Sequence, residues 1–118
     1  MDIHTNIHNV FLDVDTAIPC GLVINELVSN SLKHAFPPGV IGDAAIARRI
    51  WIEFELRGDQ LALTVGDNGI GFPSELDFRS TDSLGLQLVM ALVEQLKGDI
   101  ELERGQGTIF RITFSRPR

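Results

Sequence analysis

Three polar residues within one apolar segment form the first group whose spacing suits chemistry. Glu26, Asn30 and Lys33 are four and three residues apart, so at about 100° per residue they fall in one stripe of a helix. Leu27 and Val28 belong to the opposite, apolar side of that helix. A carboxylate and an amide oxygen are hard ligands that suit Mg²⁺, and an ammonium beside them suits phosphate. The stripe also fits the solvated polar face of an ordinary amphipathic helix.

A carboxylate followed by two glycines forms the second group. Asp67 comes directly after a buried strand pattern and precedes Gly69 and Gly71. A carboxylate at a strand end, beside backbone that can take positive φ, is a good acceptor for a planar amino group such as that of adenine. The two glycines would let the chain pass close to a ring. A plain turn is the alternative, since Asp-Asn-Gly is a common turn sequence.

Two further positions suit ligand binding through the ends of elements. Gly85 and Leu86 stand at the predicted start of a helix, where backbone N–H groups without helical partners form an anion site. Thr108 follows a glycine at the start of the last predicted strand, where its hydroxyl can donate or accept a hydrogen bond. Each position has an ordinary alternative, because many helices begin near a glycine and threonine is common in strands.

Apolar periodicity predicts the elements that position these groups. The proline pair of Pro37 and Pro38 ends the first helix, and Gly58-Asp59 predicts a hairpin turn. The predicted order is strand, helix, strand, strand, helix, strand, strand, at residues 10–14, 16–35, 46–57, 60–65, 84–96, 100–102 and 109–114. We therefore predict an α+β fold, a two-layer α/β sandwich with one mixed, mainly antiparallel sheet and helices on one face.

The ends and the inner faces of the two helices can also be predicted. Asp15 or Thr16 is the expected cap of the first helix, and one of residues 81–83 is the expected cap of the second. The core side of the second helix is expected to carry Leu88, Val89, Leu92, Val93 and Leu96.

Length, charge and cysteine content narrow the class of protein. The 118 residues suit one domain, residues 1–118, and a hydrophobic content of 44% allows a real core. A net charge of −6 argues against non-specific nucleic-acid binding and against an anionic membrane surface. No apolar run approaches the roughly 18 residues of a membrane span, so no direct membrane contact is expected. The single cysteine, Cys20, cannot form an internal disulfide, which favours a reducing, cytoplasmic location.

The helix stripe, the Asp67 group and the Gly85–Leu86 helix start with Thr108, in this order along the chain, together resemble a known family. The chain is similar to the catalytic ATP-binding (HATPase, Bergerat-fold) domain of sensor histidine kinases. Residues Asn25–Pro37 resemble its asparagine box, Asp67–Phe72 its first glycine box and Ser83–Val89 its second. The form of the asparagine box, with the short Ser-Leu-Gly-Leu second box, is similar to the HWE-related subgroup.

The resemblance assigns the phosphate end of an ATP site. It implies that Asn30 holds Mg²⁺ and that Glu26 polarises a water or the attacking group, or helps to order the metal. Lys33 and His34 would contact phosphates, and Gly85–Leu86 would offer backbone N–H groups. Many histidine kinases have a second asparagine at the position of Glu26, and more than one glycine in the second box.

The resemblance also assigns the adenine end of the site. Asp67 would accept a hydrogen bond from the adenine amino group, with Thr108 assisting through water. Gly69 and Gly71 would shape the pocket and hinge a mobile lid over ATP. The polar segment at residues 74–82, which has no clear period, would be that lid.

The implied activity is that of a protein histidine kinase in two-component signal transduction. The domain would bind ATP·Mg²⁺ and donate the γ-phosphoryl group to a histidine on a separate dimerisation domain, for passage to a response regulator. His4 and His8 lie in a predicted strand or tail, so the acceptor is expected outside this chain. A serine kinase of the anti-sigma-factor type and a degenerate nucleotide- or partner-binding module without transfer are the alternatives.

Overall fold

The computed structural model describes residues 2–7, 12–32, 49–69, 83–105 and 107–115. In chain order the elements are β1 (Asp2–Ile7), α1 (Val14–Asn30), β2 (Arg49–Arg57), β3 (Gln60–Asp67), α2 (Leu84–Gln95), β4 (Asp99–Gly105) and β5 (Gly107–Ser115). Within these ranges, neither helix has the length and apolar character needed to cross a membrane.

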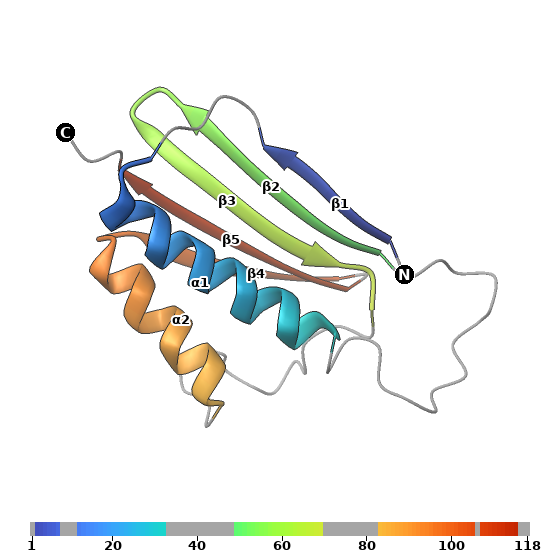
Figure 1. Ribbon diagram of the computed structural model, residues 1–118. Coiled ribbons are helices and arrows are strands. Elements are labelled where there is room, and N and C mark those ends of the chain that lie inside the picture. The colour runs from blue at the N-terminus through green and yellow to red at the C-terminus, as the bar shows by residue number, and fades with distance from the viewer. Residues whose placement is uncertain (1, 8–11, 33–48, 70–82, 106, 116–118) are drawn as a thin grey trace.

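The strands form one sheet in the order β1-β2-β3-β5-β4. β1 runs parallel to β2, whereas β2 with β3, β3 with β5 and β4 with β5 are antiparallel. Figure 1 shows α1 and α2 side by side on one face of this sheet. The predicted two-layer sandwich with a mixed, mainly antiparallel sheet is therefore confirmed.

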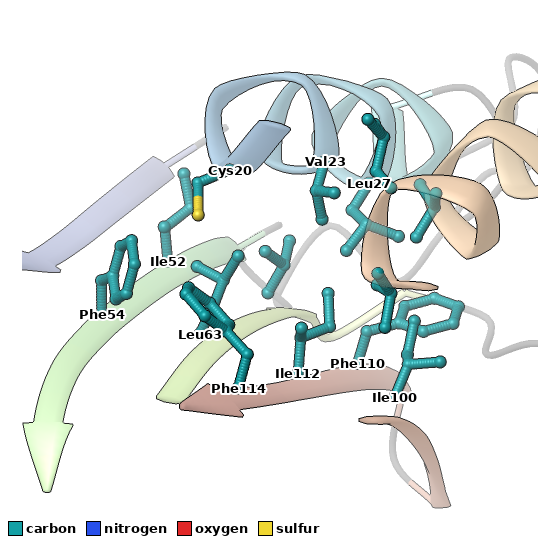
Figure 2. Packing of buried hydrophobic residues seen from close by; sticks show 14 of the residues in the cluster. Cys20, Val23, Leu27, Ile52, Phe54, Leu63, Ile100, Phe110, Ile112 and Phe114 are labelled. Carbon is teal, nitrogen blue, oxygen red and sulfur yellow. The ribbon is translucent and has the colours of Figure 1, made fainter. Parts of the chain in front are cut away.

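The hydrophobic core lies between the helices and the sheet (Figure 2). Successive side chains of a strand point to opposite faces, so alternate residues of β2, β3 and β5 meet the helices. Ile52, Val65 and Phe110 lie opposite one another across these three strands, and Val23 and Leu27 descend from α1. Burying such a side chain stabilises the fold by about 1.5–3 kcal/mol. The cluster consists of Cys20, Val23, Leu27, Ile52, Phe54, Leu61, Leu63, Val65, Leu86, Val89, Leu92, Val93, Ile100, Phe110, Ile112 and Phe114.

Side-chain caps fix where both helices begin. Asp13 caps α1, and its Oδ1 accepts a hydrogen bond from the Thr16 N–H at 2.9 Å. Ser83 caps α2, and its Oγ accepts from the Leu86 N–H at 3.4 Å. The prediction of a cap within residues 81–83 is confirmed. The predicted cap at Asp15 or Thr16 is wrong, because Asp13 satisfies the first-turn N–H groups two residues earlier.

One further prediction about the elements is wrong, and another is right except at one residue. The strand expected at residues 10–14 does not form, since Leu12 and Asp13 are outside any strand and Val14 begins α1. The first strand is instead β1, which lies in the segment predicted to be a strand or tail. On α2, Leu88 is 39% exposed whereas Leu86 is buried. The other predicted core residues are confirmed, because Val89, Leu92 and Val93 are buried and Leu96 packs against the core.

Candidate functional site

Four element ends that carry the predicted site residues meet at one end of the sandwich. The carboxyl end of α1 lies over the end of β3, beside the first residues of β5, as Figure 1 shows. The first turn of α2 contacts the last turns of α1. Of the predicted site residues, the described ones are Glu26, Asn30, Asp67, Gly69, Gly85, Leu86 and Thr108. Lys33, His34, Gly71 and the predicted lid at 74–82 lie outside the described residues.

The Asp67 carboxylate is held at both oxygens. Asp67 is only 2% exposed, although it is the last residue of β3. The Ser31 hydroxyl donates to Oδ2 at 2.7 Å, and the Gly69 N–H donates to Oδ1 at 3.0 Å. A carboxylate oxygen has two lone pairs, so each oxygen keeps a further acceptor position after these bonds form. The arrangement fixes the direction in which Asp67 can receive a third donor.

Thr108 lies directly opposite Asp67 in the register of β3 and β5. Ile50 is opposite Asp67 on the other side, in β2, so these three side chains share the helix-covered face of the sheet. Thr108 is 8% exposed and Ile50 is fully buried. A carboxylate and a hydroxyl are thus paired beside an apolar side chain where these three strands meet.

Close backbone approach at Gly107 keeps this pair in place. Gly107 has φ +133°, and a Cβ built there would lie 2.1 Å from the carbonyl oxygen of Asp67. Only glycine can therefore begin β5 at this position without moving the end of β3. Asn68 is anchored on the other side, because its Oδ1 accepts from the Arg49 N–H at 2.7 Å.

Glu26 and Asn30 lie at the start of α2. A Cβ built on Gly85 would lie 2.5 Å from Glu26 Oε2 and 3.8 Å from Asn30 Oδ1. Both oxygens are therefore close to the same point, and both residues are half-buried between the helices. Carboxylate and amide oxygens are the donors that Mg²⁺ accepts, so these two residues fit a magnesium site.

Two consecutive residues of the asparagine box, Asn30 and Ser31, link both ends of the site. Asn30 approaches Gly85, whereas the next side chain, Ser31, reaches Asp67. Residues 31 and 32 continue α1 as a π-type turn, and the Ser31 N–H at its start approaches the carbonyls of Leu27 and Val28. Such turns often occur at functional positions in helices. The end of α1 thereby places two consecutive side chains on different parts of the site.

Two residues that matter for this geometry were not among the predicted site residues. Ser31 is buried and hydrogen-bonded. It lies within the asparagine box, where ligand-binding roles were assigned only to other residues. Its signal in the sequence is a hydroxyl on the core side of the first helix. Gly107 was noted only as the glycine that precedes Thr108, since its contact with Asp67 depends on the pairing of two distant strands.

Comparison with known proteins identifies the family. The profile of the family described as "Histidine kinase-, DNA gyrase B-, and HSP90-like ATPase" matches residues 16–118. The chain belongs to this family. All the motif residues lie within the matched range, and the mixed sheet with its helix layer is the Bergerat fold of these ATPase domains.

The curated relatives are sensor histidine kinases. The sensor histidine kinase PdtaS of Mycobacterium tuberculosis is 36% identical over 110 residues, which are 89% of this chain and 21% of PdtaS. Blue-light-activated histidine kinase 2 of Erythrobacter litoralis is 34% identical over 104 residues, which are 87% of this chain and 29% of that protein. The chain therefore spans about a fifth to three tenths of the length of these relatives.

Solved structures give the same assignment. The histidine kinase domain of the Erythrobacter litoralis EL346 blue-light activated histidine kinase superposes with a TM-score of 0.85 at 28% identity, covering 97% of this chain and 51% of that one. The catalytic domain of histidine kinase ThkA shares the fold with a TM-score of 0.72 at 21% identity, over 98% of this chain and 79% of that one. The chain is thus a catalytic ATPase domain of the histidine kinase type, with HWE-type relatives, as its motifs predicted.

Proposed function

We propose that this chain, as one domain, binds ATP·Mg²⁺ and donates the γ-phosphoryl group to a histidine on a separate dimerisation domain. The observation that carries the proposal is the juxtaposition at the end of α1. There Ser31 fixes the Asp67 carboxylate, while the preceding Asn30 lies beside Glu26 and Gly85. The end of α1 therefore contributes both to Asp67, which suits a nucleobase, and to the group of Glu26 and Asn30, which suits Mg²⁺ and phosphates.

Asp67 is the proposed acceptor for the adenine amino group, with Thr108 beside it. The carboxylate is buried and held by Ser31 and Gly69, so it is positioned before a ligand arrives. A preorganised acceptor favours a base that offers an N–H donor, because a carbonyl oxygen at the same place would face a negative carboxylate. The adjacent glycines, Gly69 and Gly71, would let the ring approach the backbone.

Glu26 and Asn30 are the proposed magnesium-binding end. The charged side chains among the described site residues are Glu26 and Asp67, and both are acidic. ATP phosphates are negative as well, so a divalent cation is needed between them and the Glu26 carboxylate. When bound, Mg²⁺ would neutralise the phosphate oxygens. Lys33, His34 and the backbone N–H groups of Gly85–Leu86 are the further proposed phosphate contacts.

The protein's contribution to the reaction would be positioning. In the proposed transfer the bond between the γ-phosphorus and the oxygen that bridges it to the β-phosphate breaks, and a bond to an imidazole nitrogen forms. ADP leaves with the electron pair of the broken bond. Glu26 would orient the attacking group, and Asp67 would fix the other end of ATP, so that attack is in line. The response regulator and a cytoplasmic location are inferred from the same family assignment.

Calorimetry with a non-hydrolysable ATP analogue tests the binding site. We expect the native chain to bind in a Mg²⁺-dependent way. Asp67→Asn should lose at least about tenfold in affinity, since an amide would bring a donor to face the adenine donor. Asn30→Ala should instead lose the Mg²⁺ dependence. A folded native chain that binds no adenine nucleotide would leave only the degenerate-module alternative.

Phosphotransfer requires a second experiment with an added acceptor. Labelled ATP should label a histidine-bearing dimerisation domain only in the presence of this chain, and the label should be lost in acid, because phosphohistidine is acid-labile. An acid-stable label would indicate serine transfer of the anti-sigma-factor type. A stoichiometric label on His4 or His8 would contradict the proposal that the acceptor lies elsewhere.

A further inference from the structure

The space beside Gly85 is filled by a side chain from the other helix. A Cβ built on Gly85 would lie 2.5 Å from Glu26 Oε2 and 3.6 Å from Glu26 Cδ. Ordinary contacts between heavy atoms are about 3.5–4.0 Å long. The Glu26 carboxylate therefore occupies the place that any side chain at position 85 would take. Because this carboxylate ends a flexible chain, an added methyl group would displace it and leave the helix intact.

The charge pattern of α2 gives an independent reason for this contact. The first turn of α2 contains no acidic residue of its own. The positive end of a helix dipole is stabilised by a nearby negative charge, usually an acidic residue in that turn. Here the acid comes from α1, because the Glu26 carboxylate lies against the second residue of α2. The start of α2 thus leaves room for the Glu26 carboxylate, and the positive end of the helix dipole attracts its negative charge.

We propose that Gly85 is a positioning residue that leaves the space in which α2 holds the Glu26 carboxylate beside Asn30. The proposal rests on the proposed function, in which Glu26 and Asn30 serve the phosphate end of ATP. It differs from the role that the motif resemblance assigns to this glycine, the presentation of a backbone N–H to phosphate. In the present proposal, the lack of a Cβ on Gly85 makes room for the Glu26 side chain.

The contact can be tested without nucleotide. In the NMR spectrum of the nucleotide-free native chain, protons of the Glu26 side chain should show nuclear Overhauser effects to the backbone protons of Gly85. Gly85→Ala should abolish these effects and leave the melting temperature unchanged or slightly raised, since alanine favours helix over glycine. Gly21→Ala in α1 is the matched control, because nothing lies within 4 Å of its added Cβ. Persistence of the effects in Gly85→Ala would overturn the proposal.

A double-mutant cycle tests the consequence for the site. Gly85→Ala should weaken binding of the Mg²⁺·ATP analogue by about tenfold and binding of adenosine by less than about twofold. In a Glu26→Ala background, Gly85→Ala should have less than about a twofold further effect on binding of the Mg²⁺·ATP analogue, since the displaced carboxylate is gone. Gly21→Ala should leave both affinities within about twofold of the native values.

Two outcomes of this cycle would overturn the inference. An equal loss from Gly85→Ala in both backgrounds would mean that position 85 acts through its own backbone. A parallel loss of adenosine binding would mean a general distortion of the pocket. A native chain that binds neither ligand would refute the proposed function instead, and the nucleotide-free NMR comparison would still decide whether Gly85 positions Glu26.

Discussion

One buried hydrogen bond joins two motifs that are 36 residues apart in the sequence. The Ser31 hydroxyl donates to Asp67 at 2.7 Å, and both residues are at least nine-tenths buried. Hydrogen bonds to charged groups contribute about 1.5–3 kcal/mol, and a buried acceptor left without its donor adds a desolvation cost. At the scale of single residues, this bond decides where the Asp67 carboxylate points.

Ser31→Ala should therefore weaken both the fold and the site. We expect a loss of about 1–3 kcal/mol in the free energy of unfolding, because Asp67 loses a donor in a buried place. Affinity for an ATP analogue should fall by about tenfold, which corresponds to about 1.4 kcal/mol. Urea unfolding and calorimetry measure the two effects. Ser115→Ala, at the exposed end of β5, is the control, and native-like affinity in Ser31→Ala would show that the bond is dispensable.

The Cys20 thiol gives a pH-dependent prediction at the same scale. Burial raises its pKa from 9.0 to about 11. Because the folded-state pKa is the higher one, the thiol's contribution to stability is complete below pH 9 and is lost as the pH rises towards 11. The stability difference between the native chain and Cys20→Ala, measured by urea unfolding, should narrow over this range. A difference that stays constant from pH 8 to about 11 would contradict this prediction.

At the scale of elements, the pairing of β3 with β5 carries the adenine end of the proposed site. The two strands are in register from Gln60 with Ser115 to Asp67 with Thr108. Since Gly107 begins β5 against the Asp67 carbonyl, the start of one strand determines the position of the end of the other. The backbone positions of Asp67 and Thr108 are therefore set by the pairing of the two strands.

Gly107→Ala should disturb this pairing far more than an alanine at another positive-φ glycine. We expect a loss of about 3 kcal/mol or more, because backbone strain and steric overlap add. Gly58→Ala is the matched control, since Gly58 has φ +62° with open space around it, and it should cost about 1 kcal/mol. Urea unfolding compares the two variants. Equal losses would show that the overlap with Asp67 relaxes without cost.

At the scale of the whole molecule, the core between the two layers keeps these element ends together. α1 contacts both the sheet and α2, so its buried side chains support the adenine end and the phosphate end at once. Leu27 is 1% exposed, and it lies one residue beyond Glu26 on the core side of the helix. Its packing therefore determines how deeply α1 sits on the sheet.

Leu27→Ala should destabilise the domain by about 2–5 kcal/mol, since it leaves a cavity in a close-packed core. Leu22→Ala removes the same atoms from the same helix at a position that is 43% exposed, and it should cost less than about 1 kcal/mol. Thermal or urea unfolding of both variants, with nucleotide affinity measured well below the transition, checks this contrast. Similar costs at the two positions would mean that the α1 packing described here is wrong.

The sequence by itself determined the class of fold, most of the elements and the family. Period-two alternation in β2 and β3 and helical spacing around Leu27 are local patterns, and the three motifs are short, so both can be read without knowing the fold. The errors have local causes too. Asp13 competes with Asp15 and Thr16 for the same orphan N–H groups, and the first helix turn could not be told from a short strand.

Only the tertiary structure decided which residues touch one another. The bond from Ser31 to Asp67, the fit of Glu26 against Gly85 and the approach of Gly107 to Asp67 each join segments that are distant in the chain. Helix and strand periodicity show which face a side chain occupies, but they contain no information about the partner across the interface. That partner depends on strand register and on how α1 and α2 pack, and both are set by the core as a whole.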